Sequence, residues 1–508
     1  MRLSEVLQDA RSGAVTPSLD LPGDFQDGVG NLDIKGIAIS SDKVQPGFIF
    51  AALPGHHTHG AHYVPDAVDR GAVAVITDER GKRIIGKQGE VGVPVMEVGD
   101  PRRLAATIAA AVAGFPAHSL TMVGVTGTNG KTSVSYLVSM ALQAHGIACG
   151  VLGTLGARIG DRSLDSGPRT TPEATDIHPI LKSMHDDGAR AVVMEVSSIA
   201  LCENRVDGIT FDLAVFTGLS HDHLDYHEDM ETYFAAKSEL FTPERARQAV
   251  VLVDDEWGAR LASAATIPVV TVSTRGRDAD WQVLAARDGL RLLGADGEFN
   301  LDIPVAADFV LANIAVSVVS AHILGSALEA AIGAVLRARV PGRMELVARA
   351  GGIDFIVDYA HSPDAIDQVV AAARSERQAR GGGRVIVVIG AGGDRDRLKR
   401  LEMGLAASRA DVAIVTDDNP RSEDPAEIRS QVLSGFDSGA NVHEVASRHE
   451  AIGRAVSEAR EGDVVLVLGK GHETTQEGPH GVIAFDDRVV LASFVDSRFN
   501  GESGEGVT

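Results

Sequence analysis

A glycine-rich turn followed by a lysine and a threonine has the residue types needed to bind the phosphates of a nucleotide. The segment Thr121–Gly146 opens with an apolar, β-rich run, passes through TGTNGKT (residues 126–132) and continues as a helical pattern. The two glycines let backbone N–H groups close on phosphate oxygens, and the following helix presents its positive end to them. Lys131 would then reach the β- and γ-phosphates, and the Thr132 hydroxyl would bind Mg²⁺.

The turn departs by one residue from the general expression for phosphate loops. That expression requires a glycine five residues before Gly130, where this chain has Val125. A glycine-rich turn of purely structural use is therefore the alternative interpretation. A predicted strand before the turn and a predicted helix after it favour the phosphate loop.

Acidic residues and histidines follow two further predicted strands of the same region. Glu195 ends the short apolar strand that begins at Ala191, and the segment 221–227 (HDHLDYH) follows the strand Leu213–Thr217. An acid at a strand end beside a phosphate loop is placed like the Mg²⁺-binding acid of other nucleotide hydrolases, although alone it is more often a solvated cap. The histidine-rich segment is a metal site or a polar loop. Together with Glu195 and Lys131, it favours a second magnesium site.

A second group of histidines lies near the N-terminus, at residues 56, 57, 59 and 62. Four histidines so close together suggest a metal site. No cysteine or carboxylate completes a recognisable ligand set, so we expect a polar loop at a strand end instead.

Four polar motifs in the last third of the chain each follow a predicted strand. Ligands of parallel α/β sheets bind outside the carboxyl ends of the strands, so these loops are expected to converge on one pocket. Any one of them alone is also compatible with turn chemistry. The motifs are Asp358–His361, Gly392–Asp396, Asp417–Arg421 and Gly469–Glu473.

The predicted elements group into three α/β domains, as a length of 508 residues allows. Residues 1–115 form a small domain that includes a helix over Ala61–Arg70, residues 116–340 carry the phosphate loop, and residues 341–508 alternate strand and helix. That alternation predicts a doubly wound, mostly parallel sheet. Phe115-Pro116 and Pro341-Gly342 mark the boundaries, and the tail from Asn500 is expected to be disordered.

Composition excludes several classes of partner. A net charge of −23 would repel nucleic acids and anionic membranes, and no apolar run approaches the length of a membrane span. The first residues form an amphipathic helical pattern without the apolar core of a signal peptide. Two cysteines, Cys149 and Cys202, suit a reducing cytosol. We therefore expect a cytoplasmic protein. A monomer is expected as well, although composition does not bear on the oligomeric state.

Eight motifs together resemble the Mur ligases, and within them the MurE type. In chain order they are TGTNGKT, MEVSS, DHLDYH with a following AAK helix, PGRME, DYAHSPDA, GAGGDRD, DNPR and GKGHE. The resemblance covers nearly the whole chain. It implies an ATP-dependent amide ligase of peptidoglycan biosynthesis that adds meso-diaminopimelate to the D-Glu of UDP-MurNAc-L-Ala-D-Glu through an acyl phosphate.

The resemblance also assigns residues to the nucleotide, the metal and catalysis. Lys131, Lys237 and Arg343 would be catalytic, and Thr132, Glu195, His223 and Lys237 would hold Mg²⁺, with Lys237 carried as a carbamate made with CO₂. Nothing in its own spacing would distinguish Lys237 from a solvated helical lysine. The residues implied for ATP are Gly127, Thr128, Asn129, Gly130, Lys131, Thr132, Ser133, Asn313, Asp358 and His361.

The remaining assignments concern the other two substrates. UDP-MurNAc-dipeptide would be bound by Ser41, His56, His57, Thr58, Thr170, Thr171, Ser197, Glu203 and Arg205. meso-Diaminopimelate would be bound by Arg395, Asp418, Asn419, Pro420, Arg421, Gly469 and Glu473. Diaminopimelate carries one carboxylate more than lysine, and an arginine at position 421 can bind it bidentately. Glu473 would pair with the distal ammonium. The chain departs from the family pattern at Asp42, Arg169 and Glu203, and Asn313 is the one asparagine of a usual pair.

Three alternatives remain open. The same chemistry could use L-lysine, or belong to a MurF-type or folylpolyglutamate-type ligase, although Arg421 favours diaminopimelate. A phosphate-loop switch or transport protein would hydrolyse ATP without an amino acid, and it leaves DNPR and GKGHE without a purpose. A catalytically inactive homologue would be expected to lose Lys131 or Lys237, and both are present.

Closure of the C-terminal domain, with hinges near Phe115 and Pro341, is the expected gate of the active site.

Overall fold

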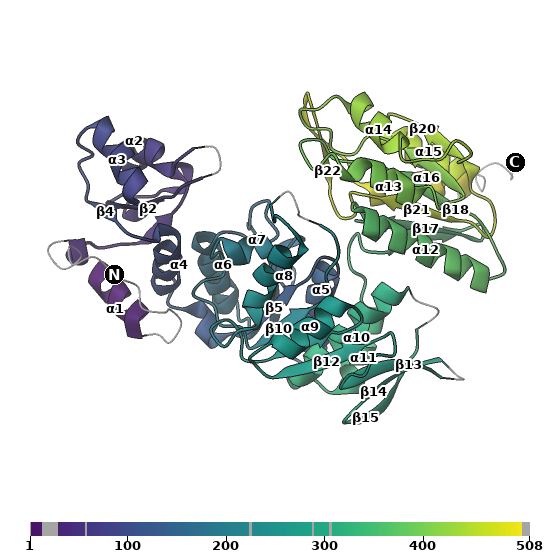
Figure 1. Ribbon diagram of the computed structural model, residues 1–508, viewed down its shortest axis with the longest axis horizontal. Coiled ribbons are helices and arrows are strands. Elements are labelled where there is room, and N and C mark those ends of the chain that lie inside the picture. The colour runs from purple at the N-terminus through teal and green to yellow at the C-terminus, as the bar shows by residue number, and fades with distance from the viewer. Residues whose placement is uncertain are drawn as a thin grey trace, which may run out of the picture.

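Three lobes follow one another along the chain, each built around its own sheet (Figure 1). The structure is a computed structural model that describes residues 2–12, 29–55, 58–222, 226–286, 289–303 and 307–499. His56, His57, His223 and the tail from Asn500 therefore lie outside the described residues. The three-domain α/β architecture expected from the sequence is confirmed.

The N-terminal lobe is a four-stranded parallel sheet in the order β1-β2-β3-β4. Its strands are β1 (Gly36–Ala38), β2 (Phe48–Ala52), β3 (Ala74–Thr77) and β4 (Val95–Glu97), and its helices are α1 (Leu3–Ser12), α2 (Val64–Asp69), α3 (Glu79–Gln88) and α4 (Pro101–Val112). Alternate strand residues enter two separate cores, one beneath α1 and α4 and one beneath α2 and α3.

Two features of this lobe differ from the sequence prediction. The helix expected over Ala61–Arg70 is a 3₁₀ turn, Gly60–Tyr63, followed by the short α2, whose first turn contains a proline. Neither α3 nor β4 was expected, because α3 is mostly polar, contains two glycines and buries few side chains. One of those glycines, Gly81, is required by packing, since a Cβ there would overlap the Thr77 hydroxyl.

The central lobe contains an eleven-stranded sheet in the order β15-β14-β13-β12-β11-β10-β5-β9-β6-β7-β8. Its middle strands are parallel and its two ends are antiparallel hairpins. The strands are β5 (Thr121–Thr126), β6 (Cys149–Gly153), β7 (Gly156–Ile159), β8 (Arg162–Leu164), β9 (Ala191–Glu195), β10 (Leu213–Phe216), β11 (Ala249–Leu252), β12 (Val269–Ser273), β13 (Trp281–Ala286), β14 (Gly289–Gly294) and β15 (Gly297–Leu301).

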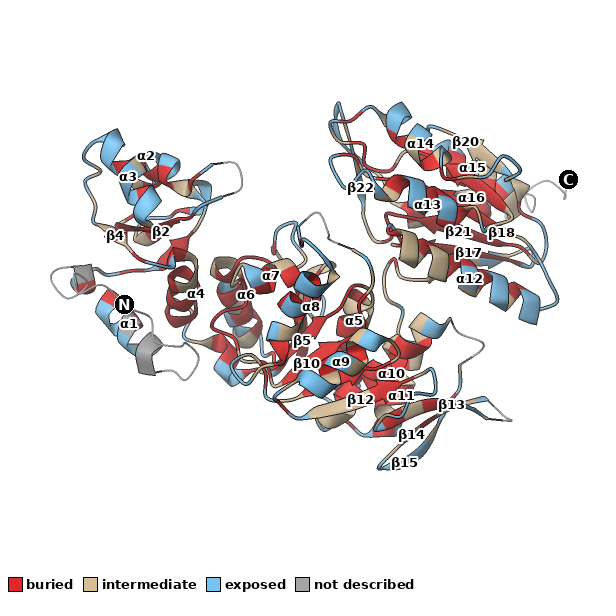
Figure 2. Ribbon diagram, in the orientation of Figure 1, coloured by how far each residue is buried: buried red, intermediate tan, exposed pale blue. Residues whose placement is uncertain are grey.

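Helices cover both faces of this central sheet. One core joins alternate strand residues to α5 (Lys131–Ala144), α10 (Asp308–Ile323) and α11 (Leu328–Arg337). The opposite core joins the intervening residues to α6 (Ala174–Asp186), α7 (Ser198–Cys202), α8 (Met230–Ser238) and α9 (Glu256–Ala264). β5 and β10 are buried almost throughout, as Figure 2 shows. Burial on both faces is the reason these parallel strands are continuous apolar runs in the sequence.

The C-terminal lobe is the doubly wound sheet that the alternating pattern predicted, in the order β16-β17-β21-β18-β19-β20. All strands are parallel except the edge strand β16. The strands are β16 (Glu345–Ala350), β17 (Ile353–Asp358), β18 (Val385–Ile389), β19 (Val412–Val415), β20 (Val442–Glu444) and β21 (Val464–Leu468), with a separate hairpin of β22 (Thr475–Gly478) and β23 (Gly481–Ala484).

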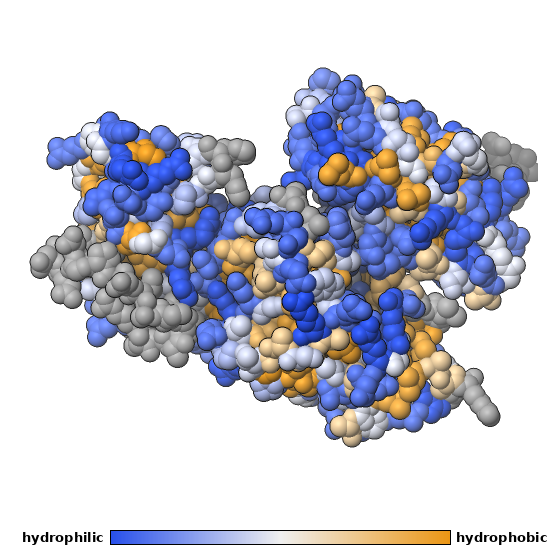
Figure 3. All heavy atoms as spheres, viewed as in Figure 1, coloured by the Kyte–Doolittle hydropathy of each residue, from blue (hydrophilic) through white to orange (hydrophobic). Residues whose placement is uncertain are grey.

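Helices again divide between the two faces of this sheet. α12 (Pro363–Ala379), α13 (Lys399–Ala407) and α14 (Pro425–Leu433) share one core, and α15 (Arg448–Glu458) and α16 (Asp487–Phe499) share the other. Hydrophilic residues predominate on the face shown in Figure 3, in keeping with the net charge of −23. Within the described ranges, no helix is long and apolar enough to cross a bilayer.

Polar contacts join the lobes. Lys43 pairs with Asp176 across the first junction at 2.8 Å. Across the second junction, the Asn129 amide donates to Asp364 at 3.1 Å. The Asn129–Asp364 contact and the predicted phosphate loop lie at the carboxyl ends of parallel strands, so this loop and the C-terminal motifs face one another.

Candidate functional site

The predicted phosphate loop lies between the end of β5 at Thr126 and the start of α5 at Lys131. Gly127 and Gly130 have φ values of +148° and +84°. A Cβ at Gly127 would overlap the Thr217 hydroxyl, and one at Gly130 would lie 2.5 Å from Asn313 Oδ1. Only glycine fits both positions, because side chains from the end of β10 and from α10 pack against the loop.

Two lysine side chains meet at one carbonyl of this loop. Lys131 Nζ donates to the carbonyl oxygens of Gly127 and Thr128, both at 2.9 Å. Lys237 Nζ, from α8, also donates to the Gly127 carbonyl at 2.9 Å and lies 4.6 Å from the centre of the Tyr233 ring. Sequence spacing alone would have placed Lys237 on the surface, but its side chain is 1% exposed.

The surroundings of Lys237 favour a neutral amine. Burial lowers the pKa of Lys237 well below its ordinary value, and the charge of nearby Lys131 lowers this pKa further. The Asp222 carboxylate acts to raise this pKa, but burial has the larger effect. A neutral amine is the form of lysine that can react with CO₂.

Glu195 lies at the end of β9 and is the most connected acid near the loop. Its carboxylate accepts hydrogen bonds from the Thr132 hydroxyl at 3.1 Å, from Thr154 N at 2.8 Å and from the Thr154 hydroxyl at 3.1 Å. This group of oxygen ligands fits Mg²⁺, which prefers carboxylate and hydroxyl oxygens. Thr154, which follows β6, was missed by the sequence analysis because its pairing with Glu195 depends on strand order.

The histidine-rich segments have structural contacts in the parts that are described. His227 Nε2 is 2.8 Å from the Ser198 hydroxyl in a buried setting. The buried His59 accepts a hydrogen bond from Ala61 N and donates through Nε2 to Asp78, the N-cap of α3. Among residues whose placement is given, no three or more His, Cys, Asp or Glu form a metal-binding group. The magnesium role of His223 stays a prediction.

Arg343, from the C-terminal lobe, contacts the end of the predicted phosphate loop. Its Nη2 donates to the Thr132 hydroxyl at 3.2 Å, and its guanidinium lies 4.1 Å from the centre of the Tyr359 ring. The next residue, Met344, has φ +42°, a strained conformation of the kind found at functional sites. Arg343 therefore spans the junction between the two lobes.

Asp358 anchors the segment that carries Arg343. It accepts from Met344 N at 2.6 Å and from Ala360 N at 2.7 Å, while burial raises its pKa. His361 lies on the loop after Asp358, and its Nδ1 is 2.8 Å from the Tyr359 carbonyl oxygen. All ten predicted ATP residues lie within the described residues, and they come from the loop after β5, from α5, from α10, from the end of β17 and from the loop that follows it.

Three residues predicted for the UDP-linked substrate, Thr170, Thr171 and Ser197, lie beside Glu195. The Thr171 hydroxyl donates to the Glu195 carbonyl at 2.9 Å and accepts from Ser197 N at 3.0 Å, and the Thr170 hydroxyl is 3.1 Å from that of Thr154. Ser41 and Thr58 lie instead on loops that follow β1 and β2 of the N-terminal lobe.

A buried carboxylate that the sequence analysis missed organises the arginines there. Glu173 pairs with Arg102 at 2.5 Å, with Arg205 at 3.2 Å and with Arg169 at 3.4 Å. Arg205 also pairs with Glu203 and donates to the Thr171 carbonyl. The departures at Arg169 and Glu203 therefore belong to one ion-pair network at the junction of the first two lobes.

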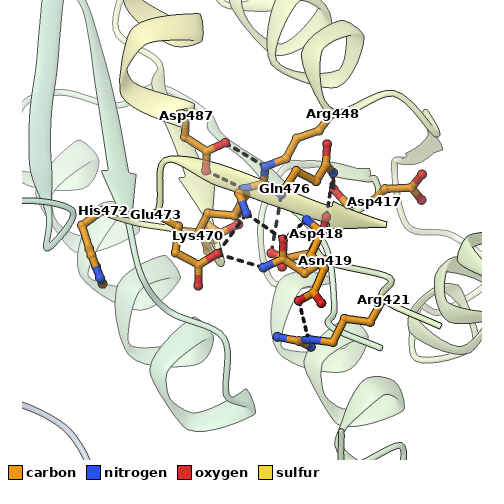
Figure 4. Close-up of polar contacts among 12 residues, drawn as sticks. Asp417, Asp418, Asn419, Arg421, Arg448, Lys470, His472, Glu473, Gln476 and Asp487 are labelled. Atoms are coloured by element: carbon orange, nitrogen blue, oxygen red, sulfur yellow. Dashed lines mark hydrogen bonds and ion pairs between the residues drawn. The ribbon is translucent and has the colours of Figure 1, made fainter. Parts of the chain in front are cut away.

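Most residues predicted to bind the amino-acid substrate lie on the loops after β19 and β21 (Figure 4). The Asn419 amide donates to Glu473 Oε2 at 2.8 Å. Arg421, with φ +51°, donates to the Gly393 carbonyl at 2.7 Å and contacts Glu477 at 3.2 Å. Arg395 is exposed on the loop after β18. Asp418 and Pro420 are buried on either side of Asn419, and Gly469 begins the neighbouring loop.

Three protein-family descriptions match the chain over the same three lobes. Residues 33–113 match "Mur ligase family, catalytic domain", residues 125–321 match "Mur ligase middle domain", and residues 342–471 match "Mur ligase, glutamate ligase domain". The chain belongs to the Mur ligase family. The resemblance inferred from the eight motifs is confirmed.

Individual relatives of this Mur ligase extend the comparison. The chain is 44% identical, over 91% of its length and 92% of the relative's, to a protein of Streptomyces coelicolor named UDP-N-acetylmuramoyl-L-alanyl-D-glutamate–2,6-diaminopimelate ligase. A solved structure of a ligase with that name is 30% identical, with a TM-score of 0.66 and coverage of 98% and 99%. MurF ligase from Thermotoga maritima, solved with ADP, shares the fold at 17% identity, a TM-score of 0.61 and coverage of 92% and 99%.

Proposed function

We propose that this Mur ligase joins meso-diaminopimelate to the D-Glu carboxylate of UDP-MurNAc-L-Ala-D-Glu, with ATP as the energy source. The observation that carries the proposal is the group of charged side chains on the loops after β19 and β21, with Asp418 and Arg421 on one loop and Glu473 on the other (Figure 4). Such a group offers a cation, Arg421, to the extra carboxylate of diaminopimelate and acids to its ammonium groups. The name of the Streptomyces relative supports this assignment.

The phosphate loop and Arg343 support the first step. Lys131 and Arg343 would bind the γ-phosphate and offset the charge that develops on its oxygens during transfer to the D-Glu carboxylate. Thr132, Glu195, His223 and carbamylated Lys237 would hold Mg²⁺, which supplies further positive charge for the phosphate oxygens. The product of this step would be an acyl phosphate.

The remaining residues would direct the second step. Thr171, Ser197 and Arg205 would orient the muramoyl dipeptide beside Glu195, with its D-Glu carboxylate toward the loop. The free amine of diaminopimelate attacks the acyl phosphate, and phosphate leaves as the amide forms. Closure of the C-terminal lobe would exclude water, which otherwise hydrolyses the acyl phosphate. We infer a cytoplasmic location, since ATP and UDP-linked sugars are cytoplasmic substrates.

Phosphate release by the purified protein tests the proposal. The reaction contains ATP, Mg²⁺ and UDP-MurNAc-L-Ala-D-Glu, together with meso-diaminopimelate, L-lysine or no amino acid. Diaminopimelate-dependent release with a tripeptide product by mass is the expected result. Equal use of lysine would contradict the assignment of Arg421, and release without any amino acid would favour a nucleotide-hydrolysing switch.

Arg421→Ala is expected to lower kcat/KM for diaminopimelate by roughly 100-fold, the effect of losing a charge-assisted, bidentate interaction. Activity with lysine should change little, so the variant loses selectivity more than chemistry. Steady-state kinetics with both amino acids measure this effect. Arg409→Ala is the control, because Arg409 is an exposed arginine of the same lobe that pairs with Asp367. An equal loss with both amino acids would argue against the carboxylate contact.

A further inference from the structure

A fully buried ion pair lies directly behind the Asp417–Arg421 loop. Arg448, the first residue of α15, donates through Nε to Asp487 Oδ1 at 2.8 Å and through Nη2 to Asp487 Oδ2 at 2.6 Å. Asp487 is the first residue of α16, and both side chains are 0% exposed. Arg448 Nη2 also donates to the Leu468 carbonyl at the end of β21. The pair thus connects two helices to the strand that precedes GKGHE.

One nitrogen of this buried arginine has no hydrogen-bond acceptor among the described residues. It is Nη1, and the anionic atom that faces it is Asp418 Oδ2 at 3.9 Å. The Asp418 carboxylate itself receives no hydrogen bond from the described residues, although the Gln476 amide donates to its backbone carbonyl. Figure 4 shows Arg448 between Asp487 and the loop that carries Asp418.

The position of Asp418 is also restricted from the other side. Gly469 has φ +113°, and a Cβ there would lie 2.6 Å from Asp418 Oδ2. The carboxylate therefore has room only because Gly469 lacks a side chain. Although burial acts to lower the pKa of Arg448, Asp487 raises it above its ordinary value, so Arg448 keeps its charge.

The Glu473 carboxylate is also held by a buried cation. Lys470, which is also 0% exposed, donates to Glu473 Oε2 at 2.9 Å and to Asn419 Oδ1 at 3.0 Å. Two buried cations, Arg448 and Lys470, thus lie among three carboxylates, those of Asp418, Glu473 and Asp487. The cluster carries one negative charge in excess, which suits an ammonium group of the incoming amino acid.

We propose that Arg448 is a positioning residue that orients the Asp418 carboxylate toward an ammonium group of the amino-acid substrate. This inference rests on the proposed function. Arg448 would not touch the substrate, and its guanidinium would act through Asp418. Asp487, the first residue of α16, would in turn fix the orientation of Arg448. α16 would therefore influence the amino-acid site without contacting the substrate.

A double substitution tests this role without leaving the buried Asp487 carboxylate unpaired. Removal of one member of a buried ion pair strongly destabilises a protein, whereas replacement of both by apolar residues is often neutral. Arg448→Met combined with Asp487→Leu should therefore fold. We expect its KM for diaminopimelate to rise roughly tenfold, because one charge contact with the substrate is weakened. The kcat and the KM for ATP should stay within about twofold of the wild type.

A matched control comes from the opposite end of the same sheet. Arg377 pairs with Asp354 at 2.7 Å, and both side chains are buried; Asp354 also pairs with the exposed Arg349 and Arg380. Arg377→Met with Asp354→Leu makes the same chemical change far from the carboxyl ends of the strands. We expect this control to change the melting temperature at most, with the KM for diaminopimelate unchanged.

A double-mutant cycle with Asp418→Asn separates positioning from a structural effect. If Arg448 acts through Asp418, replacing the ion pair in the Asp418→Asn background should raise the KM no further. Additive effects, or an unchanged KM in the folded pair variant, would overturn the inference. If the wild type itself shows no diaminopimelate-dependent phosphate release, the proposed function fails instead. If the pair variant does not fold, the conservative Arg448→Lys variant gives the same KM comparison.

Discussion

Lys131→Met is expected to lower kcat for tripeptide formation by roughly 1,000-fold, with a much smaller change in the KM for diaminopimelate. Lys131 extends from the first turn of α5 over the phosphate loop, where its ammonium already lies 2.9 Å from two loop carbonyl oxygens. In the reaction this charge would be offered to the transferring phosphoryl group, and loss of one such group typically costs this much. Single-turnover phosphate release measures the effect.

The matched control is Lys182→Met. Lys182 is a half-exposed lysine on α6 that pairs with Asp186 one turn away. Its removal should leave kcat within twofold of the wild type, because exposed ion pairs contribute little. A Lys131→Met enzyme with nearly normal kcat would mean that the phosphate loop does not perform the transfer, and the proposed ligase reaction would have to be abandoned.

Lys237→Ala is expected to reduce kcat by a similar factor, roughly 1,000-fold, for a different reason. Lys237 is buried beside the Tyr233 ring and donates to the Gly127 carbonyl. Reaction of its neutral amine with CO₂ forms an N–C bond, releases a proton and creates a carboxylate-like group. The alanine variant would lack this group. Added acetate or formate should restore part of the activity, since either supplies a carboxylate of similar size.

Two further measurements examine the Lys237 carbamate. ¹³C NMR of wild-type protein equilibrated with ¹³CO₂ should show one carbamate resonance that is missing from Lys237→Ala. Lys237→Arg should be inactive and should not respond to acetate, because the arginine fills the space without forming a carbamate. Full activity of the wild type after rigorous removal of CO₂, together with no carbamate resonance, would contradict the modification.

The order of the elements along the chain was predictable because it depends on local patterns. The buried parallel strands of the central and C-terminal lobes are continuous apolar runs, and glycines mark the loops that follow them. The same patterns failed for α3, whose polar surface and internal glycines conceal a helix. Local patterns therefore identified the domains better than the polar elements at the edge of the first lobe.

Contacts between side chains distant in sequence were decided by the tertiary structure. Thr154 reaches Glu195 because β6 and β9 are neighbours in the sheet, although they are separated along the chain. Arg343 reaches Thr132 because the third lobe packs against the second. Strand order and lobe packing depend on the burial of whole faces, which no single motif encodes.

The sequence by itself determined the glycine-rich loop between a strand and a helix, the three-domain organisation and the family, because these depend on residue types at fixed spacing. Tertiary structure alone decided which charges are buried and which groups they face. In the folded protein the Lys237 amine is buried, Glu173 pairs with three arginines, and Arg448 lies behind Asp418. The physical reason is that desolvation and ion pairing depend on every neighbour in space, and most of those neighbours are far away in the chain.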